Sequence, residues 1–261
     1  MPTLAAVLIV KDEQDNLADC LESLRWVDEI VVYDTGSRDA TPAIARRYTE
    51  RVISDAHWQG FGIARQRAQR QTEADWILMV DADERVSPEL AAEIRAITRH
   101  QPARTVYQLP RLTWVFGRFI RHGGWYPDPV IRLYPNALTQ YDDALVHERL
   151  RLPAGTEIAR LHHPLIHYSY RDLRHYLVKS AQYADDWARQ QAARGKRAGL
   201  AQGLLHGVAC FLRMYLVKAG FLDGRQGLLL ALLSAHSTFV KYAALWERSG
   251  QASGPKEENA R

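Results

Sequence analysis

Apolar and amphipathic stretches alternate along the first 135 residues of the chain. The apolar runs are short and rich in β-branched residues, and the stretches between them repeat apolar residues at helical spacing. This alternation predicts an α/β domain with a largely parallel sheet covered by helices on both faces. Strands are expected at residues 4–10, 29–34, 52–53, 76–80, 105–109 and 130–134, and helices at 16–25, 39–48 and 87–97, the last with Ser87 as N-cap and Pro88 at its first position.

From about residue 170 the pattern predicts helices. Residues 173–197 are polar and basic, whereas residues 199–246 are far more apolar. The uncharged run Gly227–Val240 is shorter than the about 20 apolar residues that a membrane span needs. A wide apolar stripe rimmed by Arg213 and Lys218 favours a helix lying in the membrane interface, although a helix pair closing a core would show the same stripe. The stripe consists of Leu204, Leu205, Val208, Phe211, Leu212 and Tyr215.

Charge is distributed unevenly along the chain. Residues 1–159 contain 19 Lys and Arg against 23 Asp and Glu, and residues 160–250 contain 13 against 5. This distribution argues against a nucleic-acid partner and suits a catalytic domain followed by a segment that meets an anionic surface. We expect a domain of residues 1–169, a helical membrane-associating region of residues 170–248 and a disordered tail of residues 249–261.

Cysteine usage and the N-terminus indicate the compartment. Cys20 and Cys210 allow at most one disulfide and lack metal-ligand spacing, which favours a reducing environment. The first apolar run has no basic residue before it and leads directly into Lys11-Asp12-Glu13, unlike a signal peptide. The sequence therefore predicts a cytoplasmic protein.

Three carboxylates follow the apolar run Trp76–Val80: Asp81, Asp83 and Glu84. If the strand end is extended, Asp81 and Asp83 point the same way. Carboxylates this close suit Mg²⁺ or Mn²⁺, which proteins hold with one or two carboxylates together with substrate phosphates. Such an ion would offset both the repulsion between the acids and the charge of a diphosphate.

Three classes of enzyme are candidates for this chain. A dinucleotide-binding oxidoreductase needs a glycine-rich turn after the first strand, where this chain has the sequence KDEQ. A phosphatase of the haloacid-dehalogenase type has Thr or Val at the fifth motif position, where this chain has Arg85, and its motif follows the first strand. A sugar transferase with a nucleotide-diphosphate donor fits both the position and the sequence of the acids.

Several ordered motifs together resemble one family. They are VLIVKDEQDNLADCLESLRWVDEIVVYDTGSRDAT, WQGFGIARQRA, DWILMVDADERVSPEL, HGGWYPDPVIRLY and LVHERL, followed by HYSYRDLRHYLVKSAQYA and GFLDGRQGLLLALLSAHSTFVKYAALW. They resemble the family-2 inverting glycosyltransferases of the GT-A fold, and within them the lipopolysaccharide inner-core β-1,4-glucosyltransferase subfamily. The resemblance extends to about Arg248 and implies a Rossmann-like sheet with flanking helices.

The resemblance also implies a nucleotide-sugar site. Val10, Lys11 and Glu13 would border the base and ribose. Asp34 would accept a hydrogen bond from the uracil N3–H. The alternative for Asp34 is that its carboxylate only makes an Asx-type turn bond to Ser37 or Asp39. Arg65 would pair with a phosphate or carboxylate near the donor, more plausibly than Arg67. Asp81 would hold the ribose, or the metal through water, and Asp83 would be the direct metal ligand. Glu84 is expected to face solvent or to pair with Arg85.

Inversion needs one base to take the acceptor proton. Glu148, in VHE, is the preferred candidate, and Asp128, which precedes Pro129, is the alternative. Trp125 and Tyr126 have flat rings suited to stacking on a sugar, and His147 would position the acceptor or contact phosphate. The remaining candidates for contact with a phosphorylated acceptor are Arg118, Arg121 and Arg132.

The function implied is metal-dependent, inverting transfer of a hexose, glucose from UDP-glucose, onto an inner-core heptose of lipopolysaccharide. The expected partners are a UDP-sugar, a lipid-linked oligosaccharide acceptor and, through the C-terminal helices, the cytoplasmic face of the inner membrane. The alternatives are the same fold acting on polyprenyl phosphate, and a non-catalytic membrane-associated scaffold.

Overall fold

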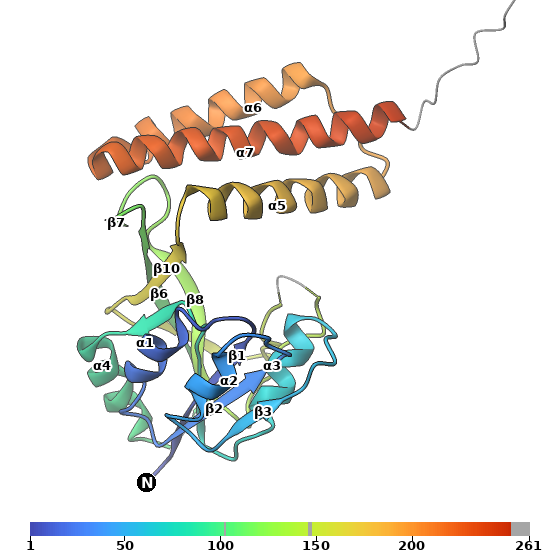
Figure 1. Cartoon of the computed structure of the whole chain (residues 1–261). Coiled ribbons are helices and arrows are strands. Elements are labelled where there is room, and N and C mark those ends of the chain that lie inside the picture. Colours follow the sequence, from blue (N-terminus) through green and yellow to red (C-terminus); the bar gives the residue numbers. More distant parts are fainter. Residues whose placement is uncertain (102, 146–147, 252–261) are drawn as a thin grey trace, which may run out of the picture. The chain divides into compact units, whose positions relative to one another are not determined.

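The computed structural model describes residues 1–101, 103–145 and 148–251 (Figure 1). The chain divides into two compact units. The first comprises Met1–Leu112 and Pro127–Tyr168, and the second comprises Thr113–Tyr126 and the chain from Ser169 onward. The second unit therefore takes up a segment, Thr113–Tyr126, that the sequence pattern placed with the first 169 residues.

The described strands form one sheet in the order β3-β2-β1-β4-β8-β6-β10-β5, with β7 and β9 paired to β6. The strands are β1 Leu4–Val10, β2 Glu29–Asp34, β3 Val52–Ser54, β4 Trp76–Met79, β5 Glu84–Val86, β6 Thr105–Val115, β7 Arg118–Ile120, β8 Asp128–Pro135, β9 Glu157–Arg160 and β10 Leu165–Tyr170. The helices of the first unit are α1 Leu17–Glu22, α2 Thr41–Ala45, α3 Phe61–Gln69 and α4 Pro88–Thr98.

The predicted α/β class is confirmed, but only part of the sheet is parallel. β1 runs parallel to β2 and β4, and β2 runs parallel to β3. β8 is antiparallel to both β4 and β6, and β5 is antiparallel to β10. Parallel neighbours need a long crossover, usually a helix, and no helix separates β6 from β8. The second half of the sheet is therefore mixed.

Alternate residues of the central strands fill two cores, as a sheet covered on both faces requires. From β1, Leu4 and Leu8 enter the core shared with α1, α2 and α4, and Val7 enters the core shared with α3. The predicted start of α4 is confirmed, because Ser87 Oγ accepts a hydrogen bond from Leu90 N at 3.2 Å. These contacts hold the carboxyl ends of β1, β2 and β4 in place.

Glu93 connects α4 to the segment before β10. Its carboxylate accepts backbone N–H bonds from His162, at 2.9 Å, and His163, at 3.0 Å. Burial alone would raise the pKa of Glu93, but these bonds, together with those of the two imidazoles, lower it to about 2. The carboxylate is therefore more acidic in the folded chain than in the unfolded chain.

Replacing Glu93 with glutamine should lower the free energy of unfolding by about 1–2 kcal/mol at neutral pH, because hydrogen bonds to a charged acceptor are lost. A lowered pKa stabilises the fold above the unfolded-state pKa, and this contribution disappears as pH falls from about 4.5 to about 2. Urea unfolding at pH 7 and pH 3 measures both effects, with the exposed Glu73→Gln as control. An unchanged difference between wild type and variant at the two pH values would contradict this role.

The second unit contains α5 Leu173–Ala193, α6 Leu200–Leu212, a π-helical turn Arg213–Val217, a 3-10 turn Gly220–Asp223 and α7 Gly224–Gln251. α6 packs on α7 through Gly203 and Gly207. A Cβ at Gly203 would lie 2.8 Å from Tyr242 Cβ, and one at Gly207 would lie 3.1 Å from the Ala235 carbonyl oxygen. A Cβ at Gly203 would therefore force the two helices apart, and one at Gly207 would require a small shift of α7.

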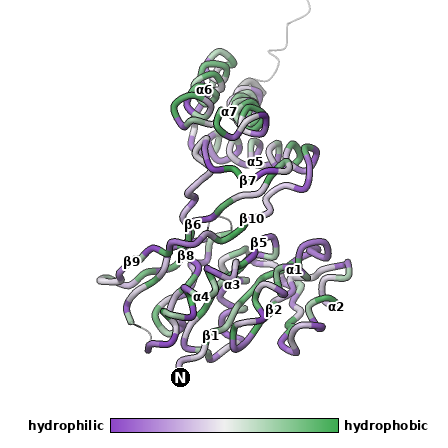
Figure 2. Tube along the Cα trace, turned by 90° about the vertical axis from the view of Figure 1, so that its left-hand side faces the viewer, coloured by the Kyte–Doolittle hydropathy of each residue, from purple (hydrophilic) through white to green (hydrophobic). Residues whose placement is uncertain are grey.

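Two segments of the second unit are long and apolar enough to cross a membrane. Leu200–Val217 has a mean hydropathy of 1.4 and Gly220–Ser249 one of 1.5, and most of their residues are not buried. Figure 2 shows hydrophobic residues along much of α6 and α7. Length and composition do not distinguish a helix that spans a bilayer from one that lies on it.

Candidate active site

The carboxyl ends of three adjacent parallel strands form the base of the candidate site. β1 ends at Val10, β2 at Asp34 and β4 at Met79, and Val10 is the register partner of Asp34. The Val10 carbonyl accepts a hydrogen bond from Thr35 N at 2.9 Å. Ligands of open α/β sheets bind beyond such strand ends.

Asp34 is buried and makes the turn bond that its sequence position allows. Its Oδ1 accepts hydrogen bonds from Ser37 N at 3.1 Å and from Ser37 Oγ. Ser37 Oγ in turn accepts from Asp12 N at 2.9 Å, which joins the loops that follow β1 and β2. The carboxylate is thus held rigidly at the strand end, and its contact with uracil stays a prediction.

The loop after β1 has a defined conformation. Asp12 has a φ of +54°, and Glu13 N donates to Thr41 Oγ1 at 2.8 Å. Glu13 Oε2 accepts from Asn16 Nδ2 at 2.8 Å, and Lys11 is exposed beside it. These bonds give the loop a fixed backbone on which Lys11 is the exposed cation.

The three carboxylates after β4 lie in a turn rather than in the extended strand end expected from the sequence. Glu84 N donates to the Asp81 carbonyl at 2.9 Å, and β5 begins at Glu84. Asp81 and Asp83 therefore have different surroundings. The turn separates one carboxylate that binds arginines from another that faces a histidine.

Asp81 binds two buried arginines. Arg65 Nη2 lies 2.7 Å from Asp81 Oδ1, and Arg132 Nη2 contacts Asp81 Oδ2. Burial would raise the pKa of Asp81, but the two guanidinium groups hold it well below its usual range. Since both oxygens already accept from arginines, Asp81 is less available to a metal than Asp83.

Glu84 is fully buried, which corrects the expectation that it faces solvent or pairs with Arg85. Its Oε1 lies 3.0 Å from Arg132 Nη2, and its Oε2 accepts from Asp81 N at 2.9 Å. Arg85 donates instead to backbone carbonyls, including that of Asn16 at 2.8 Å. Burial and the neighbouring Asp81 and Asp83 raise the pKa of Glu84, against the effect of Arg132. Glu84 is therefore a structural anchor of the turn.

Asp83 faces a histidine from the other end of the sheet. β10 pairs with β5, and Tyr168 N donates to the Asp83 carbonyl at 2.8 Å. This pairing places His167 Nε2 3.3 Å from Asp83 Oδ2. A carboxylate oxygen and an imidazole nitrogen at this distance are the donor pair around which an ion and a diphosphate could assemble. Among the described residues, no group of three or more His, Cys, Asp or Glu side chains is arranged to hold a metal ion.

The two predicted base candidates each bind an arginine. Glu148 Oε1 accepts from Arg65 Nε at 2.8 Å, so one guanidinium bridges Glu148 and Asp81. Asp128 Oδ2 accepts from Arg111 Nε at 2.9 Å. Glu148 is thereby linked through Arg65 to the carboxylate after β4, and the choice between Glu148 and Asp128 as the base stays a prediction.

The motif WQGFGIARQRA places Arg65 by docking α3 against residues 141–145. A Cβ at Gly62 would lie 2.0 Å from the Asp142 carbonyl oxygen, so no other residue fits there. Gln66 Nε2 donates to the Tyr141 carbonyl at 2.9 Å. Arg65 Nη1 is buried and has no hydrogen-bond partner among the described residues. Arg65 pairs with Asp81 and Glu148, whereas Arg67 pairs with Asp55 at 2.8 Å, and the preference for Arg65 at the donor stays a prediction.

The predicted acceptor residues Trp125 and Tyr126 belong to the second unit. Their loop is fixed by the buried carboxylate of Asp223, which accepts from His122 N at 2.7 Å and from Arg121 N at 3.1 Å. Arg118 and Arg121 are exposed in this unit. Arg132, by contrast, is buried on Asp81 and Glu84, which corrects its expected role at the acceptor. His147 lies outside the described residues.

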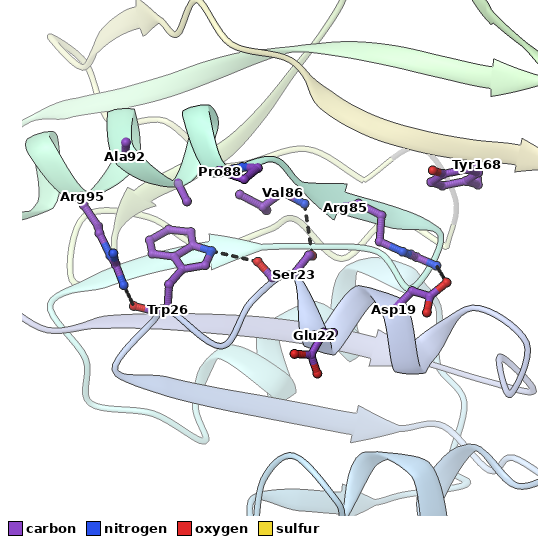
Figure 3. Close-up of a pocket in the computed structure, with 11 residues that line it drawn as sticks. Asp19, Glu22, Ser23, Trp26, Arg85, Val86, Pro88, Ala92, Arg95 and Tyr168 are labelled. Atoms are coloured by element: carbon purple, nitrogen blue, oxygen red, sulfur yellow. Dashed lines mark hydrogen bonds and ion pairs between the residues drawn. The ribbon is translucent and has the colours of Figure 1, made fainter.

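A groove of about 690 Å³ lies between α1 and α4, on the other side of the turn (Figure 3). Figure 3 shows Trp26 and Arg95 at one end of it and Arg85 and Tyr168 at the other. The polar groups drawn bind the protein itself: Trp26 Nε1 donates to the Ser23 carbonyl at 2.9 Å, and Arg95 Nη2 donates to the Trp26 carbonyl at 3.0 Å. These hydrogen bonds hold the side chains at one end of the groove in place.

Sequence reasoning missed the parts of the site that depend on long-range pairing. His167 reaches Asp83 only through the pairing of β10 with β5, and no local pattern signals this. Arg111, which binds Asp128 and lies 3.5 Å from Glu84, was likewise not identified. Arg132 did carry a signal, because a lone charge in the apolar strand VIRLY has to find a buried partner.

Comparison with known proteins identifies the family. Residues 5–150, more than half of the chain, match Glycosyl transferase family 2. The lipopolysaccharide core biosynthesis glycosyltransferase LpsC of Rhizobium meliloti is 26% identical over 98% of this chain and 97% of its own length. An uncharacterized glycosyltransferase of Rickettsia felis is 26% identical over 95% of this chain and 90% of its own length.

Among solved structures, S. aureus TarS in complex with UDP-GlcNAc is 16% identical, covers 96% of this chain and 92% of that chain, and has a TM-score of 0.48. Glucosyl-3-phosphoglycerate synthase of Mycobacterium tuberculosis, in complex with Mn²⁺, UDP and glucosyl-3-phosphoglycerate, is 28% identical over 32% of this chain and 34% of that chain, with a TM-score of 0.29. The fold is a mixed α/β sheet with flanking helices and long apolar C-terminal helices. By its match over residues 5–150, this chain belongs to glycosyl transferase family 2, a family of inverting hexosyltransferases.

Proposed function

We propose that this glycosyltransferase moves glucose from UDP-glucose onto an inner-core heptose of lipopolysaccharide, with a divalent ion at Asp83. The observation that carries the donor and metal parts is the division of the three carboxylates. Arg65 and Arg132 neutralise Asp81 and Glu84, whereas Asp83 lies beside His167. The acceptor part is supported by the full-length similarity to a relative named for lipopolysaccharide core biosynthesis.

The donor would bind across the ends of β1, β2 and β4. Val10, Lys11 and Glu13 border the base and ribose, and Asp34 accepts the uracil N3–H. Arg65 Nη1, which has no hydrogen-bond partner among the described residues, donates to the diphosphate. A buried arginine already fixed by two carboxylates loses little side-chain entropy when it binds a phosphate.

Asp83 and His167 are the residues that would hold Mg²⁺ or Mn²⁺. The carboxylate oxygen of Asp83 fits either ion, because the ion needs few protein ligands when substrate phosphates supply the others, whereas the imidazole nitrogen of His167 suits the transition-metal ion Mn²⁺ better than Mg²⁺. When bound, the ion offsets the negative charge that develops on the leaving diphosphate. Asp81, which is two residues from Asp83 and is bound by Arg65 and Arg132, would orient the ribose or reach the ion through a water.

Transfer with inversion takes one step. The acceptor hydroxyl oxygen attacks the anomeric carbon, the bond from that carbon to the diphosphate oxygen breaks, and the diphosphate leaves with the electron pair. Glu148 takes the hydroxyl proton, and Arg65 holds the Glu148 carboxylate in place through the 2.8 Å bond from Nε. Trp125 and Tyr126 would stack on the acceptor sugar.

Glu148→Gln should lower kcat about 100-fold, because a positioned base typically contributes at least this factor. Glutamine keeps an oxygen for Arg65 Nε, so UDP-glucose affinity should change little. Steady-state kinetics with calorimetry measure both quantities, and Asp128→Asn is the matched variant. A larger loss of kcat in Asp128→Asn would assign the base to Asp128 instead.

The C-terminal helices would keep the enzyme on the cytoplasmic face of the inner membrane, near its lipid-linked acceptor. Donor titration by calorimetry tests the proposed function as a whole. UDP-glucose should bind more tightly than UDP-galactose when Mg²⁺ or Mn²⁺ is present, and EDTA should abolish binding. Equal affinity for UDP-glucose and UDP-galactose, with and without EDTA, would refute the proposal. Transfer of labelled glucose to lipid A-core rather than to polyprenyl phosphate tests the acceptor.

A further inference from the structure

α6 and the turn that follows it expose a continuous set of apolar side chains. Gly203 and Gly207 face α7, while Leu204, Val208 and Leu212 follow one another at intervals of four residues on another face of α6. All members are exposed, with Leu205 at 71% and Val217 at 77%. This surface, called the apolar ridge, consists of Leu204, Leu205, Val208, Leu212, Leu216, Val217, Phe221 and Leu222.

The turn beyond α6 carries exposed basic side chains. Lys218 and Arg225 lie within and directly after it, and Arg213 precedes it. Arg118 also reaches the turn, where its Nη2 donates to the Leu222 carbonyl at 3.4 Å. The apolar end of the ridge is thus surrounded by cations.

Exposed acids are lacking on the same stretch of chain. Residues 187–246 contain eight Lys and Arg and a single acid, Asp223. Asp223 is only 2% exposed, and its carboxylate accepts backbone hydrogen bonds from Arg121 and His122. A second copy of the chain would bring equal positive charge to this surface, whereas an anionic bilayer would complement it.

We propose that the apolar ridge lies in the interface of a bilayer containing anionic phospholipid, with Arg213, Lys218 and Arg225 on the lipid phosphates. Apolar side chains then enter the acyl boundary while the basic side chains stay at the headgroups. This inference deepens the proposed function and rests on it for the identity of the acceptor. It extends the apolar stripe expected from the sequence through the turn to Phe221 and Leu222, and it specifies anionic phospholipid as the partner.

Hydrogen bonds also join the docking surface to the loop of residues 121–126, which carries the predicted acceptor residues. Gly123 N donates to the Lys218 carbonyl at 2.8 Å, and Asp223 holds Arg121 and His122 from the other side of the turn. The loop that carries Trp125 and Tyr126 is therefore fixed to the segment placed on the lipid. This arrangement suits an acceptor that is itself anchored in the bilayer.

Co-flotation of the full chain with vesicles, without nucleotide, tests the proposal. The chain should float with vesicles of phosphatidylcholine and phosphatidylglycerol, should bind phosphatidylcholine alone more weakly, and should dissociate as salt is raised. Lys218→Glu combined with Arg225→Glu should weaken binding to the anionic vesicles by about 30-fold or more. Leu205→Ser combined with Val208→Ser and Val217→Ser should weaken binding to both kinds of vesicle.

Matched controls separate docking from net charge and from misfolding. Arg99→Glu combined with Arg160→Glu makes the same charge change on exposed residues of the first unit, and Val178→Ser removes an exposed apolar residue of α5. Both controls should bind vesicles like the wild type, and all variants should keep donor affinity. Equal loss in the controls, no flotation of the wild type, or a dimer that the serine substitutions dissociate would each overturn the proposal. Vesicle binding without glucose transfer would refute the proposed function alone.

Discussion

Asp83→Ala is expected to lower hexose transfer about 1000-fold, the largest loss of activity that we predict. A metal ion stabilises the charge on a leaving group by several kcal/mol, and 1.36 kcal/mol corresponds to a factor of ten in rate. The variant would keep the turn, because the bonds of Asp81 and Glu84 to Arg65 and Arg132 do not involve the Asp83 side chain. UDP-glucose affinity in Mn²⁺ should fall to the value that the wild type shows in EDTA.

The matched control is Asp19→Ala, which removes a carboxylate that is 83% exposed on α1. This control should transfer glucose like the wild type at all Mn²⁺ concentrations. Initial rates measured against Mn²⁺ concentration compare the three proteins. A rate for Asp83→Ala within a few-fold of the wild-type rate would favour the alternative that the chain is a non-catalytic scaffold.

Arg132→Leu is expected to cause the largest loss of stability, about 3–5 kcal/mol, because it removes the buried cation that Asp81 and the fully buried Glu84 share. Arg132 is buried and contacts both Asp81 and Glu84. Urea unfolding measures the free energy, with Arg25→Leu as control. Arg25 forms an exposed pair with Glu22 at 3.3 Å, which is worth at most about 1 kcal/mol.

A second substitution separates the charge effect from lost packing. In Arg132→Leu combined with Glu84→Gln, one of the unpaired charges is removed, so part of the lost stability should return. The coupling arises because Glu84 is fully buried and has a raised pKa. If the two substitutions are simply additive, Arg132 stabilises the fold by packing and not by neutralising the acids.

The sequence pattern predicted the parallel half of the sheet well, because buried parallel strands have a strong local signature. Leu4–Val10 is a strand with the predicted limits, and Ser87 caps α4 as expected. The antiparallel half was missed, since the orientation of β8 depends on which strands it joins. Apolar periodicity contains no information about that choice.

The candidate site shows the same division between local and long-range information. Motif order brought Arg65, Asp81 and Glu148 forward as candidates, and one guanidinium does join the two carboxylates. The family resemblance implied different roles for Asp81 and Asp83, but the residue pattern alone did not distinguish them, because their different surroundings depend on arginines and a histidine from distant segments. Arg132 comes from β8 and His167 from β10.

The central claim is that Asp83 binds a divalent ion that also contacts the diphosphate of a nucleotide sugar. A crystal structure of the chain with UDP and Mn²⁺ tests it most directly. We predict the ion about 2 Å from an Asp83 carboxylate oxygen and from the diphosphate, with Arg65 on a phosphate oxygen. An Asp83 carboxylate that stays on His167 while nucleotide binds without an ion beside it would contradict the account.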